Sequence, residues 1–211
     1  RAQLSVLELQ QQRIDRDRAA RQGDLNALLN RPPGTPLGRP EDLVPIPGTH
    51  WLIASGMDAG AGLSLIDTRA KRAQPLPAGT PAAQPDRARF ANCPDALDPR
   101  QAVLHGVSLR PAAAGHYTLY VTNHGGRESV EVFELDAALP TPTATWIGCV
   151  LLPKDMAANS VASFSDGSLL ATVLILPGKT FADAFAQRNT GIVLRWKPGE
   201  MTFSPIPGTE L

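Results

Sequence analysis

Several features that would point to common protein classes are absent or scarce in this chain. Its 211 residues include only two cysteines, and the wide spacing of Cys93 and Cys149 does not fit a zinc site of closely spaced ligands. No run approaches the roughly 20 apolar residues of a membrane span. The formal net charge is zero, which leaves no electrostatic footprint for nucleic acid or an anionic membrane. Gly-x-Ser-x-Gly, Walker and dinucleotide-binding motifs do not occur, so serine hydrolases and nucleotide enzymes lack support.

Proline and glycine, by contrast, are abundant. Twenty prolines and eighteen glycines favour a turn-rich all-β fold, and a hydrophobic content of 43% is enough to bury a sizeable core. The chain also repeats itself, because three units each contain four short segments with strand patterns: 42–46, 51–55, 63–67 and 73–76; 106–109, 117–121, 129–135 and 143–152; 160–164, 168–172, 191–196 and 201–205. Units of four antiparallel strands are typical of β-propeller blades. We therefore predict three four-stranded blades.

The predicted blades occupy residues 36–211, and residues 1–35 form an N-terminal arm and linker. Apolar residues spaced among Gln, Arg and Asp predict one or two short helices in the arm, which a Pro/Gly stretch ends. An insertion at 176–187 interrupts the third unit, and we expect it to form a lid or cleft wall. The chain begins at Arg1 and not at Met, so we expect that a targeting segment precedes it in the natural product.

Polar residues occur at matching positions of the repeat. Glu41, His105 and Asn159 each lead into the first strand of a unit, and in a propeller that strand starts beside the central tunnel. His124 follows His105 by nineteen residues, so the two histidines lie at the outer ends of one predicted hairpin. Such a pair can act as base and shuttle, or as ligands. The alternative is that two strand-end histidines merely bond to backbone groups.

Six longer motifs of this chain follow the order and spacing of motifs in one protein family across residues 39–165. They are Arg39-Pro-Glu-Asp-Leu-Val, Ile53-Ala-Ser-Gly-Met57, Leu104-His-Gly-Val-Ser108, Tyr120-Val-Thr-Asn-His124, Val130-Glu-Val-Phe133 and Asn159-Ser-Val. The chain resembles the paraoxonase/arylesterase family, relatives of the senescence-marker/gluconolactonase propellers. That resemblance implies a six-bladed propeller that hydrolyses lactones and aryl esters with calcium in its tunnel.

The resemblance also implies roles for individual residues. Glu41 and Asn159 would bind the catalytic calcium, and His105 and His124 would form the dyad that activates water. Asp42 and the Val107 carbonyl would belong to a second, structural calcium. The family has Asp where this chain has Ser160, and loss of that carboxylate weakens the second site.

Three blades cannot close a six-bladed ring. We therefore expect that a second polypeptide, or a remaining C-terminal half, completes the propeller. The predicted function is calcium-dependent hydrolysis of small-molecule lactones or esters, in a secreted or periplasmic protein without a nucleic-acid partner. A non-catalytic propeller that serves as a binding platform with structural calcium is the alternative, and sugar-lactone hydrolysis with another divalent ion is a further one. Cys93 and Cys149 either form a disulfide or remain as structural or free thiols.

Overall fold

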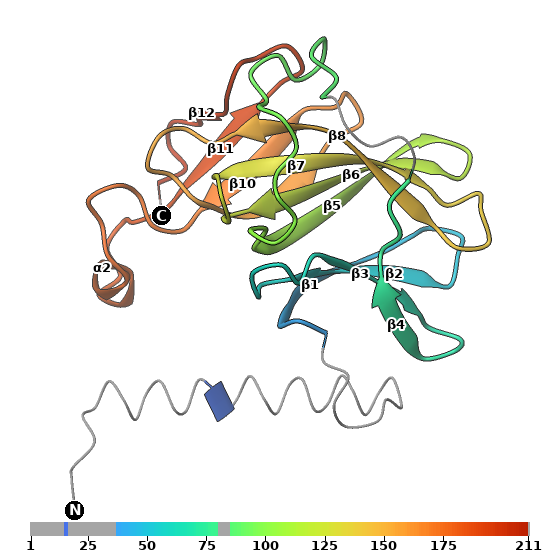
Figure 1. Cartoon of the computed structure of the whole chain (residues 1–211). Helices are drawn as coiled ribbons and strands as arrows, with labels where there is room; N and C mark the ends of the chain where they lie inside the picture. Colours follow the sequence, from blue (N-terminus) through green and yellow to red (C-terminus); the bar gives the residue numbers. More distant parts are fainter. Residues whose placement is uncertain (1–14, 17–36, 80–84, 211) are drawn as a thin grey trace, which may run out of the picture.

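The computed structural model describes residues 15–16, 37–79 and 85–210 and consists mainly of three four-stranded antiparallel sheets (Figure 1). The first sheet contains β1 (Pro40–Pro45), β2 (Trp51–Gly56), β3 (Leu63–Asp67) and β4 (Arg72–Pro75). The second contains β5 (Leu104–Ala113), β6 (His116–Asn123), β7 (Ser129–Asp136) and β8 (Thr143–Leu151). The third contains β9 (Ala158–Ser163), β10 (Leu169–Val173), β11 (Ile192–Trp196) and β12 (Ser204–Pro205), with helix α2 (Phe181–Phe185) between β10 and β11.

Each sheet is a meander in which neighbours in sequence are neighbours in space. The first strands of the sheets meet, since β5 packs against β1 on one side and against β9 on the other. The fold is thus all-β and is built from propeller-like blades whose first strands are innermost. The three predicted units are confirmed.

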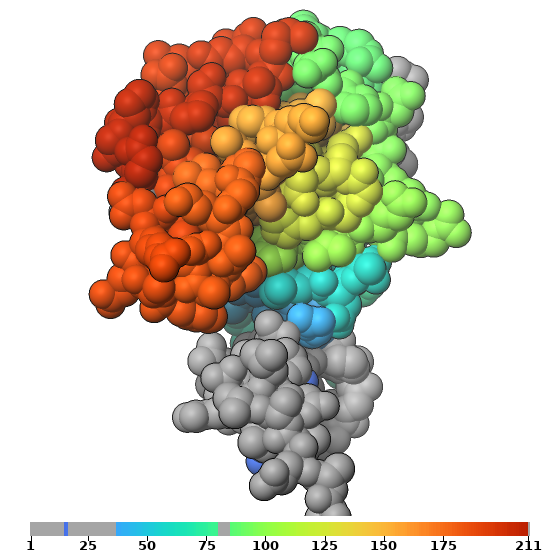
Figure 2. Space-filling model, turned by 90° about the vertical axis from the view of Figure 1, so that its left-hand side faces the viewer, coloured from blue at the N-terminus to red at the C-terminus, as the bar shows by residue number. Residues whose placement is uncertain are grey.

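Alternating apolar residues fill the spaces between the sheets. Leu65, Leu104, Leu119 and Val121 belong to the core between the first and second sheets. A second core joins the second and third sheets through, among others, Val130, Val132, Leu169, Leu194 and Trp196. Figure 2 shows the third sheet and α2 (orange to red) beside the second sheet (green to yellow), with the first sheet (cyan) below them. This packing holds the starts of β1, β5 and β9 in fixed relation.

The central hairpin is longer than the sequence predicts. The strand patterns predicted for this hairpin end at residue 109 and resume at residue 117, but β5 and β6 stay paired out to Ala113 and His116. The pairing survives Pro111 because the register shifts between Pro111 and Ala113, which accommodates a residue without an N–H donor. Only Ala114 and Gly115 lie outside the paired strands, and Gly115 has the positive φ, +76°, that a tight turn requires.

Cys93 and Cys149 form a disulfide, which answers the question that the sequence leaves open. The bond ties the connection after the first sheet to β8. The N-terminal arm predicted for residues 1–35 lies outside the described residues, apart from residues 15–16, which are helical. Within the described part of the chain, none of the helices has the length and apolar character of a membrane span.

Candidate functional site

Glu41, His105 and Asn159 occupy the same place in their strands. Each is the second residue of the innermost strand of its sheet, in β1, β5 and β9 respectively. Because β5 contacts both β1 and β9, the three positions lie at the starts of three neighbouring strands. The structure therefore places them as the repeat predicts.

The same three positions also share a β-bulge. From Leu104 to Val107 the chain advances three residues on β5, while the partner strand β6 advances only two, from Asn123 to Val121. A register shift occurs likewise on β1, between Pro40 and Leu43. A register shift also occurs on β9, where the chain advances two residues, from Ala158 to Ser160, while β10 changes by only one, from Val173 to Thr172. A bulge turns a side chain out of the strand's regular alternation, and bulges are enriched beside active sites. Three bulges at one end of the innermost strands mark that end as a candidate site.

The two histidines lie in contact. Pairing of Leu104 with Asn123 brings the outer ends of the hairpin together, and the His124 N–H donates to the Val103 carbonyl at 3.0 Å. The ring centroids of His105 and His124 are 4.2 Å apart and the ring planes meet at 79°, an edge-to-face arrangement. The hairpin geometry predicted from the sequence thus produces a real pair of imidazoles.

His105 lies in an environment that favours its neutral form. Its Nδ1 atom is buried and has no hydrogen-bond partner among the described residues. Burial, and then the neighbouring His124, lower the pKa of His105 to about 4. At neutral pH this imidazole is uncharged and can accept a proton.

His124 has a partner that sequence reasoning missed. Its Nδ1 atom lies 2.7 Å from Oε2 of Glu128. The two residues are four apart across a Gly-Gly turn, and both are partly exposed. The signal in the sequence was a carboxylate placed just beyond a short glycine turn that follows a histidine.

Glu41 lies on β1, the strand that packs beside β5, which carries His105. Glu41 is an exposed residue, but partial desolvation by the surrounding protein raises the pKa of its carboxyl group. The negative charge of the adjacent Asp42 raises this pKa further, and His124 lowers it. Repulsion between Glu41 and Asp42 is what a bound cation would offset.

Asp42 joins the first and second sheets. Its Oδ2 atom accepts from the Val107 N–H at 2.9 Å, and its own N–H donates to Ser55 Oγ at 3.1 Å. Asp42 and Val107 are therefore adjacent, and the observed contact uses the amide group of Val107. A role for the Val107 carbonyl as an ion ligand stays a prediction.

Asn159 and Ser160 lie against β5. A side chain on Gly106 would approach the Ser160 Cα to 2.6 Å and the Asn159 carbonyl to 3.0 Å, so only glycine permits this contact. Thr122 Oγ1 bonds both the Gly106 and Asn159 carbonyls at 3.3 Å. Asn159 also borders a cavity of about 390 Å³ that the insertion lines through Ala184 and Gln187. The insertion is thus a wall of this cavity, in agreement with the predicted cleft wall.

The donor chemistry at this end fits a hard cation. Glu41 offers a carboxylate and Asn159 an amide oxygen, and calcium takes about six to eight such oxygens. Among the residues that the structure describes, no three His, Cys, Asp or Glu side chains form a group able to hold a metal ion. Glu41 and Asn159 alone would therefore leave most positions of a calcium shell to other ligands.

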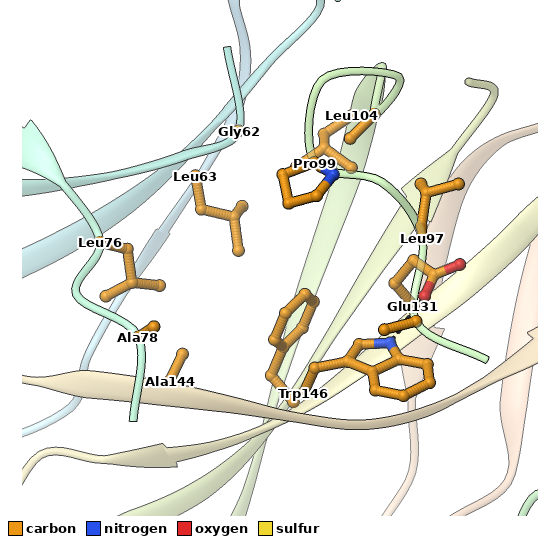
Figure 3. A pocket seen from close by; sticks show the side chains of 13 residues that line it. Gly62, Leu63, Leu76, Ala78, Leu97, Pro99, Leu104, Glu131, Ala144 and Trp146 are labelled. Atoms are coloured by element: carbon orange, nitrogen blue, oxygen red, sulfur yellow. Dashed lines mark hydrogen bonds between the residues drawn. The ribbon is translucent and has the colours of Figure 1, made fainter. Parts of the chain in front are cut away.

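A second cavity lies between the first and second sheets (Figure 3). It measures about 300 Å³ and is lined mostly by apolar side chains, including Leu63, Leu76, Leu97 and Trp146. The carboxylate of Glu131 also reaches its wall, but Arg127, Ser129 and Trp146 all donate to it. The polar group on this wall is thus already engaged, and the cavity is an apolar one.

No model of a known protein family matches this chain, and no curated protein matches it. The chain is similar to the solved structure of an oxidoreductase (glucose dehydrogenase) from Thermus thermophilus, with 18% sequence identity and a TM-score of 0.38. The similarity covers 80% of this chain and 45% of that one, so the chain spans less than half the length of that protein.

Proposed function

We propose that this chain is part of a calcium-dependent hydrolase of lactones and aryl esters, with its three sheets as three blades of a six-bladed propeller. The observation that carries the proposal is the set of three matching bulges at Glu41, His105 and Asn159, with His124 in contact with His105. On this proposal, the arrangement would supply oxygen ligands and a proton acceptor at one end of the innermost strands.

Glu41 and Asn159 would hold the ion, which when bound polarises the substrate carbonyl and stabilises the oxyanion. His105, neutral at physiological pH, accepts a proton from the attacking water. His124 assists by its contact with His105 and by its link to Glu128. The cavity beside Asn159 offers room for the body of a small substrate.

Asp42 and Val107 are adjacent and remain candidates for a second, structural calcium, with Ser160 a poor replacement for a carboxylate ligand. The remaining blades would come from a second polypeptide or from a C-terminal half of the same protein. The disulfide supports a secreted or periplasmic location.

Calcium binding by the wild type and by Glu41→Ala, measured by calorimetry, tests the ion site. We expect Glu41→Ala and Asn159→Ala to weaken calcium binding and Glu41→Ala to abolish hydrolysis in the complete assembly. Unchanged calcium affinity in Glu41→Ala would refute the assignment of the ligands.

Hydrolysis of phenyl acetate and of a simple lactone tests the histidine pair. His105→Gln should lower turnover by about 10²–10⁴-fold while calcium affinity stays unchanged, because His105 is a proton acceptor and not an oxygen ligand. His116→Gln is the matched control, since His116 is an exposed histidine at the other end of the same hairpin. Equal turnover in both variants would show that the histidine pair is structural. No turnover in the wild-type assembly would instead favour a non-catalytic binding platform, the alternative that the incomplete cation shell among the described residues leaves in place.

A further inference from the structure

The turn that carries His124 and Glu128 is built to be rigid. It runs from Asn123, the last residue of β6, to Ser129, the first residue of β7. Asn123 is buried, and its side chain is saturated with hydrogen bonds to the turn and to the preceding connection. Its Oδ1 atom accepts from the N–H groups of Val103 and Gly125, and its Nδ2 atom donates to the carbonyls of Gly125 and Arg127. One buried amide thus fixes the path of the whole turn.

The two glycines of the turn leave no room for side chains. A Cβ atom on Gly125 would clash with the Gln101 carbonyl oxygen, and Gly126 has a φ of +73°. Close packing against Gln101 therefore determines where the turn can lie.

The next residues are anchored on both sides. Arg127 donates through Nε and a terminal nitrogen to the two carboxylate oxygens of the buried Glu131, each at 2.8 Å, and donates to the Asp95 carbonyl. The Glu128 carbonyl accepts from the Leu152 N–H at 3.1 Å. The backbone of Glu128 is consequently held at a set distance from His124.

This scaffold brings a carboxylate to one particular nitrogen of His124. A carboxylate can only accept a hydrogen bond, so the 2.7 Å contact requires that Nδ1 of His124 carries the proton. We propose that Glu128 is a positioning residue for the histidine pair: it holds His124 in the Nδ1–H tautomer, so that Nε2 is the nitrogen that accepts a proton.

The two histidines are thereby made unequal. Nδ1 of His105 has no partner among the described residues, whereas Nδ1 of His124 bonds a carboxylate. When a proton reaches the pair, an N–H bond forms on an imidazole and a positive charge appears there; the charge is best stabilised on His124, beside Glu128. The proposed role in hydrolysis rests on the function proposed above, but the tautomer of His124 does not.

The decisive measurement is the ¹H–¹⁵N spectrum of the histidine rings in the full 211-residue chain at neutral pH. We expect the wild-type spectrum to show His124 protonated at Nδ1. Glu128→Gln keeps an acceptor oxygen and should keep that tautomer, whereas Glu128→Ala should shift His124 toward the Nε2–H form that imidazole prefers in water. Glu134→Ala, on the strand that follows the turn but exposed, is the control and should change nothing.

A wild-type His124 with its proton on Nε2 would overturn the inference, and so would an unchanged tautomer in a folded Glu128→Ala variant. The wild-type spectrum tests the inference by itself, so the inference can be refuted even if Glu128→Ala does not fold.

Turnover separates this inference from the proposed function. If the complete assembly hydrolyses esters, Glu128→Ala should lower kcat by about 10–100-fold with KM little changed, and Glu128→Gln should recover part of the loss. Full kcat in Glu128→Ala would refute the positioning role. A wild type with the expected tautomer but no hydrolysis in the presence of calcium would instead refute the proposed function and leave the tautomer assignment intact.

Discussion

Glu131 and Glu134 lie three residues apart on β7 and differ in their burial and in the number of their hydrogen-bond partners. Glu131 is 3% exposed and takes a two-point ion pair from Arg127 together with bonds from Ser129 and Trp146. Glu134 is exposed and meets Arg89 across the surface. Charges of the same type on one strand should therefore differ greatly in their importance to stability.

Glu131→Gln should lower the free energy of unfolding by about 3–5 kcal/mol, because it leaves the nearly buried Arg127 without its counter-charge. Glu134→Gln, the matched control, should cost less than about 1 kcal/mol. Urea denaturation of both variants measures the difference. Similar losses in the two would mean that the buried network contributes no more than a surface pair.

His105 gives the protein a pH dependence whose sign follows from its low pKa. The pKa falls from an ordinary value of 6.5 to about 4 in the folded chain. Between these values the unfolded chain binds more protons at this site than the folded chain, so the free energy of unfolding falls as the pH falls through that window. Below about pH 4 both states are protonated and the loss is complete.

Denaturant unfolding between about pH 7 and about pH 4, with EDTA present, measures this effect. His105→Gln removes the titrating ring and should show a smaller loss of stability over that range than the wild type. If the two proteins lose the same stability, the buried imidazole is not the group responsible.

At the scale of elements, the sequence predicts where strands occur and fails to predict their local irregularities. Alternation of apolar and polar residues identifies every strand to within a few residues, since the pattern reflects the two faces of a pleated strand. The bulges on β1, β5 and β9 have no such pattern, because an extra residue in a strand is defined by its partner's register. Repetition reveals equivalent positions, but only the paired strands reveal how the side chains are turned.

Burial on both faces of β7 is also hidden from the sequence. The run Ser-Val-Glu-Val-Phe-Glu-Leu puts Glu131 and Glu134 on opposite faces of a strand and does not show that Glu131 is buried. Glu131 is inside because Arg127 supplies a counter-charge and Trp146 donates a hydrogen bond to it. Glu128 was missed for a similar reason, since its role depends on a turn whose shape is set by the side chain of Asn123.

Asn123→Ala tests the importance of that turn. The substitution leaves the N–H groups of Val103 and Gly125 and two turn carbonyls without their partner, and we expect a loss of at least about 2 kcal/mol in the free energy of unfolding. The exposed Asn189→Ala is the control. Thermal unfolding measures stability, and the His124 ring signals report whether the turn has moved.

A stable Asn123→Ala variant with unchanged ring signals would show that the glycines and Arg127 suffice to shape the turn. That outcome would shift the explanation for the placement of His124 from the buried amide to backbone packing against Gln101.

At the scale of the whole molecule, contacts between distant segments of the chain determine whether the two cysteines form a disulfide. Two cysteines far apart in the sequence carry no sign of whether they pair, because pairing depends on the docking of the connection that contains Cys93 onto β8. In the folded chain their Cα atoms are 5.1 Å apart, a separation that a disulfide spans without backbone movement. Phe90, beside Cys93 in the core, packs its ring on Trp196 of β11 with centroids 6.0 Å apart. The connection is therefore held between the second and third sheets.

The disulfide should stabilise the chain mainly through its unfolded state. The two cysteines are 56 residues apart, and the loop they close contains all of β5, β6 and β7. Restricting a loop of this length removes unfolded-state entropy worth about 4 kcal/mol in the chain-entropy description. Reduction should lower the free energy of unfolding by roughly that amount, measured by urea denaturation with and without dithiothreitol. The Cys93→Ala/Cys149→Ala variant is the control: it should be less stable than the oxidised wild type and should not respond to the reductant. If reduction changes the wild type by less than about 1 kcal/mol, the unfolded chain must already be compact around the second sheet, and loop entropy is not the source of stability.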